Sequence, residues 1–228
     1  MNFKTPLIKG KLIKRYKRFL ADIALDDGQL ITAHCPNPGA MLGLVEPGND
    51  VWVSAVAPEI PRKLRYTWQI VMADNQYVGV NTNLPNDLVE EAIKNNNIPE
   101  LAKYDQYKRE VKYGQNSRID FLLNKTYLEV KYAHLKRNAH VQFPDSVTAR
   151  GSKHLAELIN MVESGFEAMV IYVAQRDDCD YFSLAADLDP HYAAMALQSQ
   201  RAGVKHLCYG CKVSPQGIYI TKRLEIVI

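Results

Sequence analysis

The chain has 228 residues, of which 47% are hydrophobic and 23% charged, a composition typical of a globular protein with a buried core. Its 28 Lys and Arg outnumber its 25 Asp and Glu only slightly, so it is not a strongly basic protein of the kind that coats nucleic acid. No apolar run reaches the ~18–20 residues that span a bilayer, and the N-terminus lacks the apolar core of a signal peptide, so we expect a cytoplasmic protein without a membrane partner.

Residues 8–82 predict a small β-barrel. The stretches QLITAHC, DVWVSAVA, RYTWQIVMA and QYVGVNT are rich in the β-branched and aromatic residues of strands. The breaks between strands contain DDG, PNPG, EPGND and APEIP, which are typical of turns. Five or so short strands in this length favour a five-stranded barrel of the oligonucleotide-binding (OB) type.

The charge excess of the whole chain lies in this N-terminal part. Residues 1–82 hold 10 Lys and Arg and 7 Asp and Glu, whereas residues 83–228 hold 18 of each. OB barrels bind nucleic acid through basic grooves and stacking aromatic rings. The alternative interpretation is a solvated strand face. The nucleic-acid-binding residues predicted here are Lys14, Arg15, Lys17, Arg18, Arg62, Lys63 and Arg65.

After residue 82 the pattern changes to alternating helices and strands. NDLVEEAIKNNN has helical spacing with Asn86 as its N-cap, and a longer helix begins near Ser146 or Thr148. EAMVIYVAQ is typical of a central strand buried on both faces. Asp189 before Pro190 predicts the start of a third helix. The order predicts a mixed sheet with helices against it, and hence two domains, residues 1–82 and 83–228.

The stretch RIDFLLNKTYLEVKY, residues 118–132, predicts a hairpin that carries three charged residues on its strands. Because strand side chains alternate between faces, Glu129 and Lys131 share one face. Ile119, Phe121 and Leu123 pair as one face of the first strand, and Asp120 points the opposite way. An antiparallel pairing lets Asp120 and Glu129 meet near one end of the hairpin.

Two adjacent carboxylates repel each other unless a proton or a cation lies between them. Oxygen ligands suit Mg²⁺ or Mn²⁺, and a lysine on the same face can stabilise charge on a phosphate. These residues predict metal-assisted phosphodiester hydrolysis. On spacing alone, a hairpin with one face in water is the simpler explanation, because charged residues on a solvated strand face are common.

The chain resembles a known family over nearly its full length. The hairpin resembles the signature of the PD-(D/E)XK nuclease superfamily. The stretches HCPNPGAMLGL, VGVNTNLPNDLVEEAI, YLEVK, FPDSVTARGSKHLAELI and DLDPHYA resemble the sugar fermentation stimulation protein A (SfsA) family. That resemblance implies an N-terminal OB-like barrel followed by an α/β nuclease-like domain with a mixed central sheet. It also implies DNA binding and a role in regulating sugar metabolism, notably that of maltose.

The resemblance further implies the roles of single residues. Asp120 and Glu129 would be metal ligands together with the backbone carbonyl of Val130, and Lys131 would be the catalytic lysine. In nuclease folds of this type a glutamate on the helix before the sheet often completes the site, and Glu91 matches it. The competing interpretation places Glu91 on a solvated helix face.

Cations follow the hairpin in sequence and suit a phosphate backbone beside a metal site. The alternative is a solvated loop. These predicted nucleic-acid-binding residues are Lys136, Arg137, Arg150 and Lys153.

The sequence is compatible with two main functions. The first is a Mg²⁺- or Mn²⁺-dependent deoxyribonuclease that uses Asp120, Glu129 and Lys131. The second is a DNA-binding regulator, largely insensitive to sequence, built on a nuclease fold without catalysis. A sugar sensor is a weaker third option, because no residues form a recognisable sugar site. The sequence does not indicate an oligomeric state.

Overall fold

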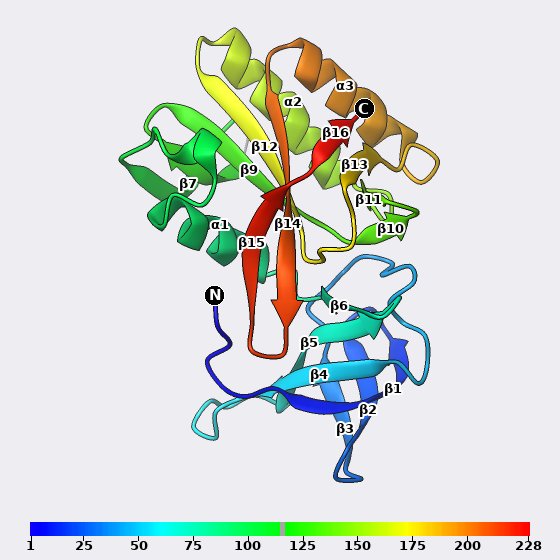
Figure 1. The fold of residues 1–228 in the computed structure, drawn as a ribbon. Helices are drawn as coiled ribbons and strands as arrows, with labels where there is room; N and C mark the ends of the chain where they lie inside the picture. The colour runs from blue at the N-terminus through cyan, green and yellow to red at the C-terminus, as the bar shows by residue number, and fades with distance from the viewer. Residues whose placement is uncertain (115–116) are drawn as a thin grey trace.

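The computed structural model describes residues 1–114 and 117–228, and it places a β-barrel beneath a larger α/β domain (Figure 1). The barrel strands follow the order β3-β2-β1-β4-β5-β6, and a parallel pairing of His34 with Thr67 joins β3 to β5. This pairing closes the five-stranded barrel that the sequence predicts. Trp68 is fully buried in its core. The strands are β1 (Ile8–Tyr16), β2 (Leu20–Leu25), β3 (Leu30–His34), β4 (Asp50–Ala55), β5 (Tyr66–Ala73) and β6 (Gln76–Gly79).

The second domain is built around a mixed sheet of six strands. β12 lies between β9 and β14 and is parallel to both, whereas the remaining pairs are antiparallel. Residues 168–174 of β12 are all buried, which confirms the predicted central strand. In spatial order the strands are β15 (Gly217–Arg223), β14 (Lys205–Ser214), β12 (Glu167–Ala174), β9 (Thr126–Ala133), β8 (Ser117–Leu123) and β7 (Tyr107–Tyr113).

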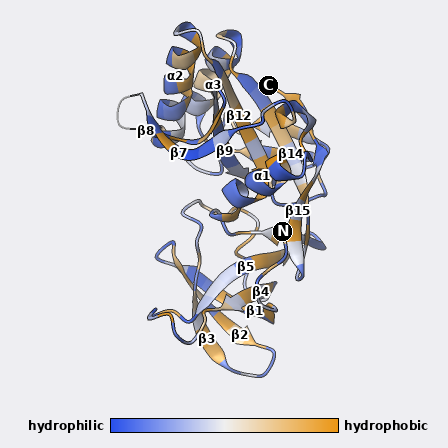
Figure 2. Ribbon diagram, turned by 90° about the vertical axis from the view of Figure 1, so that its left-hand side faces the viewer, coloured by the Kyte–Doolittle hydropathy of each residue, from blue (hydrophilic) through white to orange (hydrophobic). Residues whose placement is uncertain are grey.

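Helices cover both faces of this sheet. The apolar side of α1 (Leu84–Lys94), followed by a 3-10 turn (Pro99–Leu101), packs in one core cluster with Val130 of β9 and with Trp52 and Ile70 of the barrel. α2 (Ala149–Glu163) and α3 (Pro190–Arg201) pack in a second cluster against the opposite face. Apolar colour along β12 and β14 marks the interior between these helices (Figure 2). No helix in the two described ranges is both long and apolar enough to cross a membrane.

Capping side chains set the helix starts. The Thr148 hydroxyl accepts a hydrogen bond from the N–H of Gly151 (3.1 Å), which selects Thr148 over Ser146 as the start of α2. The Asp189 carboxylate accepts one from the N–H of Tyr192 (2.9 Å), as the sequence predicts. The prediction of Asn86 as an N-cap is wrong. Helix α1 begins at Leu84 after Asn83, because Pro85 suits the first turn of a helix, and Asn86 therefore lies inside it.

A small second sheet was not predicted. It orders the strands β10 (Leu135–Arg137), β11 (His140–Phe143), β13 (Tyr181–Leu184) and β16 (Glu225–Val227) side by side. Each strand has only three or four residues, too few for a clear alternation pattern. The pairing of β11 with β13 and of β13 with β16 also joins segments far apart in the chain, so local sequence carries little sign of it.

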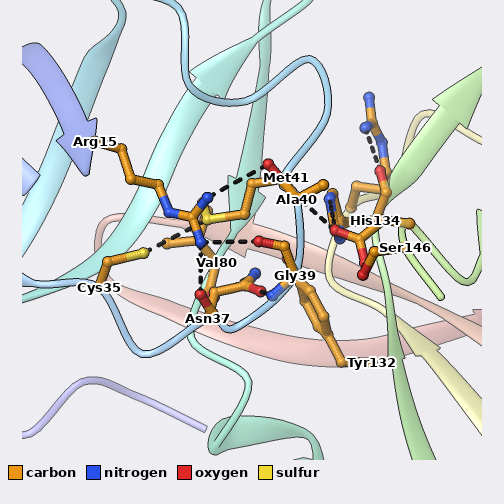
Figure 3. A network of polar contacts seen from close by, with 12 residues as sticks. Arg15, Cys35, Asn37, Gly39, Ala40, Met41, Val80, Tyr132, His134 and Ser146 are labelled. Atoms are coloured by element: carbon orange, nitrogen blue, oxygen red, sulfur yellow. Dashed lines mark hydrogen bonds and ion pairs between the residues drawn. The ribbon is translucent and has the colours of Figure 1, made fainter. Parts of the chain in front are cut away.

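The loop after β3 joins the barrel to the α/β domain (Figure 3). The guanidinium of Arg15 donates to the carbonyl oxygens of Asn37 and Gly39, both at 2.8 Å. The Asp145 carboxylate of the second domain accepts the N–H of Met41 at 2.8 Å. A Cβ atom on Gly39 would lie 2.4 Å from an oxygen of Asp145, so only glycine permits this approach.

We predict that Gly39→Ala and Asp145→Ala each lower the free energy of unfolding by about 1–3 kcal/mol, the first through overpacking and the second through loss of a partly buried hydrogen bond. The cost of Gly39→Ala should be smaller in the Asp145→Ala background, because the clashing carboxylate is then absent. Urea unfolding of the four proteins measures this coupling. Strictly additive costs would contradict the contact.

Candidate active site

Asp120 lies where strand β8 separates from β9. The two strands pair from Leu123 and Thr126 only as far as Phe121 and Leu128, while β8 stays paired with β7 down to Ser117. Asp120 occupies the next position. One of its carboxylate oxygens, Oδ2, accepts the backbone N–H of Val130 at 2.7 Å. The carboxylate therefore replaces the strand carbonyl that would otherwise bind this N–H.

This separation corrects one expectation about the hairpin. Ile119 and Phe121 do not share a face of the sheet, because Phe121 packs in the cluster that contains α1 and Ile119 in the cluster that contains α2. The strand changes its orientation at Asp120. That residue therefore faces an opening between the strands.

Glu129 is buried and engages two side chains through the same oxygen. Its Oε1 accepts Lys131 Nζ at 2.6 Å and also contacts His154 Nδ1. Only 3% of Glu129 is exposed, so the face it shares with Lys131 is not in water. The hairpin with one solvated face is thereby excluded, since α2 covers Glu129 through His154.

His154 has a defined role in this cluster. The Arg150 side chain, one helical turn earlier, lies 3.4 Å from His154 Nε2 through its Nε. Arg is always a donor, so Nε2 acts as an acceptor and the proton of a neutral ring is on Nδ1, which faces Glu129. His154 therefore positions the Glu129 carboxylate.

The two carboxylates have different pKa values for physical reasons. Burial and the neighbouring charge of Glu129 raise the pKa of Asp120 to about 6. Burial also disfavours the charged form of Glu129, but Lys131 and His154 outweigh it and hold the pKa of Glu129 below its ordinary value. Glu129 is thus the carboxylate of the pair that stays ionised, and Asp120 the one that protonates more readily.

The residues of the hairpin line a cavity of about 500 Å³ together with several cations. Arg118 and Arg150, both exposed, line it together with Lys131. Arg109 also lines it but is paired with Asp87 (2.9 Å) and Glu90 (2.7 Å). Arg118 was not predicted, although strand alternation places it on the same side as Asp120, two residues away.

The structure does not bring Glu91 to this cavity. Its carboxylate accepts the N-terminal ammonium of Met1 at 2.6 Å, and it is not among the residues that line the cavity. Asn86 takes the place foreseen for Glu91, and its side-chain amide donates to Asp120 Oδ1 at 2.8 Å. Five residues separate the two positions, which is about 140° around a helix, so they cannot face the same site.

Several of the predicted barrel cations have structural roles. Arg15 binds the loop after β3, Arg65 donates to the carbonyl oxygens of Ile60, Val56 and Ala57, and Arg62 donates to Thr67. Lys14 lies 3.6 Å from Asp22. Lys17 and Arg18 are exposed in the turn between β1 and β2, and Lys63 is exposed in the segment before β5.

The predicted cations after the hairpin are mostly paired. Lys136 binds Asp178 at 2.6 Å, and Arg137 binds both oxygens of Asp187. Lys153 lies 3.8 Å from Glu157. Arg150 alone of these four residues lines the cavity.

The oxygen donors at the cavity fit a hard divalent cation. Glu129 Oε2 is a buried acceptor without a hydrogen-bond partner among the described residues. Within residues 1–114 and 117–228 no three His, Cys, Asp or Glu side chains are grouped to hold a metal. Mg²⁺ is commonly held by only one or two carboxylates together with substrate phosphate oxygens and water. Asp120 and Glu129 meet that requirement.

Comparisons with known proteins agree with this architecture. Residues 13–80 match the family model described as the SfsA N-terminal OB domain, and residues 83–217 match that of the sugar fermentation stimulation protein RE domain. The sugar fermentation stimulation protein homolog of Paramagnetospirillum magneticum is 51% identical over 224 residues, covering 96% of this chain and 94% of the relative. That of Rhodospirillum centenum is 50% identical over 232 residues, covering 99% of each.

A solved structure shares the fold. The structure of Pyrococcus furiosus SfsA in complex with Ca²⁺ superposes with a TM-score of 0.89 at 24% identity, over 100% of this chain and 98% of that one. The predicted OB barrel followed by an α/β domain is confirmed by these matches.

We predict that Asp120 makes the metal-free protein less stable as the pH rises. Its raised pKa means that the folded state favours the protonated carboxyl, so this contribution is present at low pH and is lost as the pH passes through about 6. Wild type should lose roughly 1–1.5 kcal/mol relative to Asp120→Asn between pH 5 and 8, since one pKa unit is about 1.4 kcal/mol. Urea unfolding in EDTA measures this difference.

The matched control for this experiment is Asp26→Asn, which removes an exposed carboxylate from the barrel. It should follow the wild-type pH dependence. If Asp120→Asn does so as well, Asp120 does not titrate near pH 6.

Proposed function

Because this chain belongs to the sugar fermentation stimulation protein (SfsA) family, and because it buries two carboxylates beside a lysine in an open cavity, we propose that it binds DNA and carries a divalent-metal-dependent phosphodiesterase site. Asp120, Glu129 and Lys131 are the proposed catalytic residues. The cofactor proposed is Mg²⁺ or Mn²⁺.

The observation that carries this proposal is the carboxylate pair. Burial of two neighbouring acids costs stability, and a buried acceptor such as Glu129 Oε2 adds to that cost when it has no partner. A cation would offset both costs at once. Perturbed pairs of this kind cluster in functional sites.

The side chains have separable roles in the proposed reaction. When bound, a divalent cation polarises the phosphodiester and lowers the pKa of a water molecule. Asp120, Glu129 and the carbonyl of Val130 would hold it, and Asn86 and His154 orient the two carboxylates. The ammonium of Lys131 stabilises negative charge that develops on the phosphate.

Two further observations support the choice of ligands. The Pyrococcus furiosus relative is described in complex with Ca²⁺, which is also a hard cation bound by oxygen ligands. Arg118 and Arg150 place positive charge at the edge of the same cavity, which suits the neighbouring phosphates of a DNA strand.

A second candidate is a DNA-binding regulator without catalysis. It is favoured by the hydrogen bonds that Asp120 already accepts from Asn86 and Val130, because they compete with a cation for its oxygens. The family name connects these proteins with sugar fermentation, and under this alternative the chain acts in the regulation of sugar metabolism, such as that of maltose, through DNA.

We expect wild type to cleave plasmid and single-stranded DNA with Mg²⁺ or Mn²⁺. Asp120→Ala and Lys131→Ala should each reduce the rate at least 100-fold, because they remove a ligand and a charge on the phosphate. Asp26→Ala, which removes an exposed carboxylate from the barrel, is the matched control and should cleave as wild type does.

Metal binding is tested separately from activity. Mn²⁺ should raise the melting temperature of wild type, because it binds only the folded state, and it should not raise that of Glu129→Gln. A Mn²⁺ shift without cleavage would favour the non-catalytic alternative. Equal shifts in the two proteins would contradict the proposed ligand.

We expect the affinity for DNA to fall steeply with salt, by about one unit of log-log slope for each phosphate contact. Lys17→Ala with Arg18→Ala should weaken binding about tenfold or more at low salt and reduce the slope. The control pair is Lys125→Ala with Lys205→Ala, exposed at the end of the central sheet remote from Asp120. Fluorescence anisotropy measures both, and equal losses would contradict a role for the barrel turn.

A further inference from the structure

We propose that a hollow between the two domains binds one unpaired base of the DNA strand whose phosphate occupies the candidate active site. The inference rests on the proposed DNA binding and names the substrate class, which is DNA with a single-stranded segment. The hollow lies between the barrel loop at residues 37–39 and the segment 143–148, and it measures about 310 Å³.

The hollow adjoins the candidate active site. Thr82 and Tyr132 line both cavities. Tyr132 directly follows Lys131 on β9, and Thr82 lies in the connection between the domains. A strand that places a phosphate beside Lys131 therefore has an adjoining space for the next nucleotide.

The walls of the two cavities differ in chemistry. Lys131, Arg109, Arg118 and Arg150 line the candidate active site, whereas Arg18 is the one Lys or Arg among the described residues that line the hollow. The hollow has a mixed lining, in which Asn37, Asp145 and Ser146 lie beside apolar side chains. The apolar residues are Pro38, Phe143, Pro144 and Val147. A cavity rich in cations beside a less charged, partly apolar one matches the division of a nucleotide into phosphate and base.

The hollow is already formed before any ligand enters. Arg15 fixes the loop on the barrel side, as Figure 3 shows, and the Asp145 carboxylate fixes it by accepting the N–H of Met41. The hydroxyl of Tyr132 donates to the carbonyl of Gly79 at 2.7 Å, and its ring stacks on His134 with the centroids 5.1 Å apart. Fixed walls reduce the entropy lost on binding.

The polar groups of the hollow are largely occupied. The side-chain amide of Asn37 donates to the carbonyl of Val80 and its oxygen accepts the N–H of Gly39. Few groups are therefore left to read the edge of a base, so binding should depend on contact with the apolar side chains and be tolerant of sequence. A base in a duplex is stacked on both faces and paired along one edge, so a base must be unpaired and unstacked to enter the hollow.

The test compares the affinities of the protein for single-stranded and blunt duplex oligonucleotides of equal length. The single strand carries 2-aminopurine, whose fluorescence reports on its stacking. Both measurements are made in EDTA, so that the result does not depend on a metal. Val147→Glu places a negative charge at the rim of the hollow, where Val147 is 76% exposed. Leu30→Glu, at a position 72% exposed on the barrel hairpin away from the α/β domain, is the matched control.

Wild type and Leu30→Glu should bind the single strand at least tenfold more tightly than the duplex, with a rise in 2-aminopurine fluorescence as the base leaves its neighbours. Val147→Glu should lose both the preference and the rise, and its melting temperature should match that of Leu30→Glu. Equal affinity for the two DNA forms, no fluorescence change with wild type, or equal behaviour of the two variants would overturn the proposal. Equal affinity for single strand and duplex would contradict only the base-binding hollow and leave the proposed DNA binding intact. No binding to either form of DNA would contradict both proposals.

Discussion

The site depends on one hydrogen bond, from the N–H of Val130 to the carboxylate of Asp120. A backbone N–H in a sheet normally binds a neighbouring strand, and a buried one without a partner is costly. Here strand β8 leaves β9 at Asp120, and the side chain of Asp120 satisfies the N–H that the departing backbone would have bound. The opening that results is lined by Glu129, Lys131 and Arg118, which adjacent strands in full register would have closed.

The two carboxylates at this opening, Glu129 and Asp120, differ in how far neighbouring groups compensate their negative charge. Glu129 is stabilised as an anion by Lys131 and His154. Asp120 has amide donors from Asn86 and Val130, but among residues 1–114 and 117–228 no cation is in hydrogen-bond contact with it. The pair therefore holds excess negative charge in a partly buried place. Lys131 contacts only one of the two carboxylates, Glu129, and this is the electrostatic reason for proposing that Asp120 and Glu129 would hold a divalent cation.

The interface between the two domains also positions residues of the candidate active site. Trp52 and Ile70 of the barrel pack in one cluster with α1 and the central sheet, so the helix that carries Asn86 is held from both domains. The loop that Arg15 and Asp145 hold also lines the hollow next to Tyr132. A barrel that moved relative to the sheet would alter both the orientation of Asp120 and the adjoining space.

Local sequence was sufficient for the features that depend on neighbouring residues. Alternation along TYLEVKY placed Glu129 and Lys131 on one face, the short polar turn predicted the hairpin, and Thr148 and Asp189 marked helix starts, because periodicity and capping act over a few residues.

Only the tertiary structure decided whether the face that carries Glu129 and Lys131 was exposed to water or buried, since this depends on α2 and His154, which come later in the chain. It also decided that Asn86 rather than Glu91 faces Asp120, because the rotation of α1 is set by its packing against the sheet and the barrel. Residues that meet through packing of distant segments leave no periodic trace in either segment, and for that reason the closure of the barrel, the second sheet and the hollow between the domains were determined only by the folded chain.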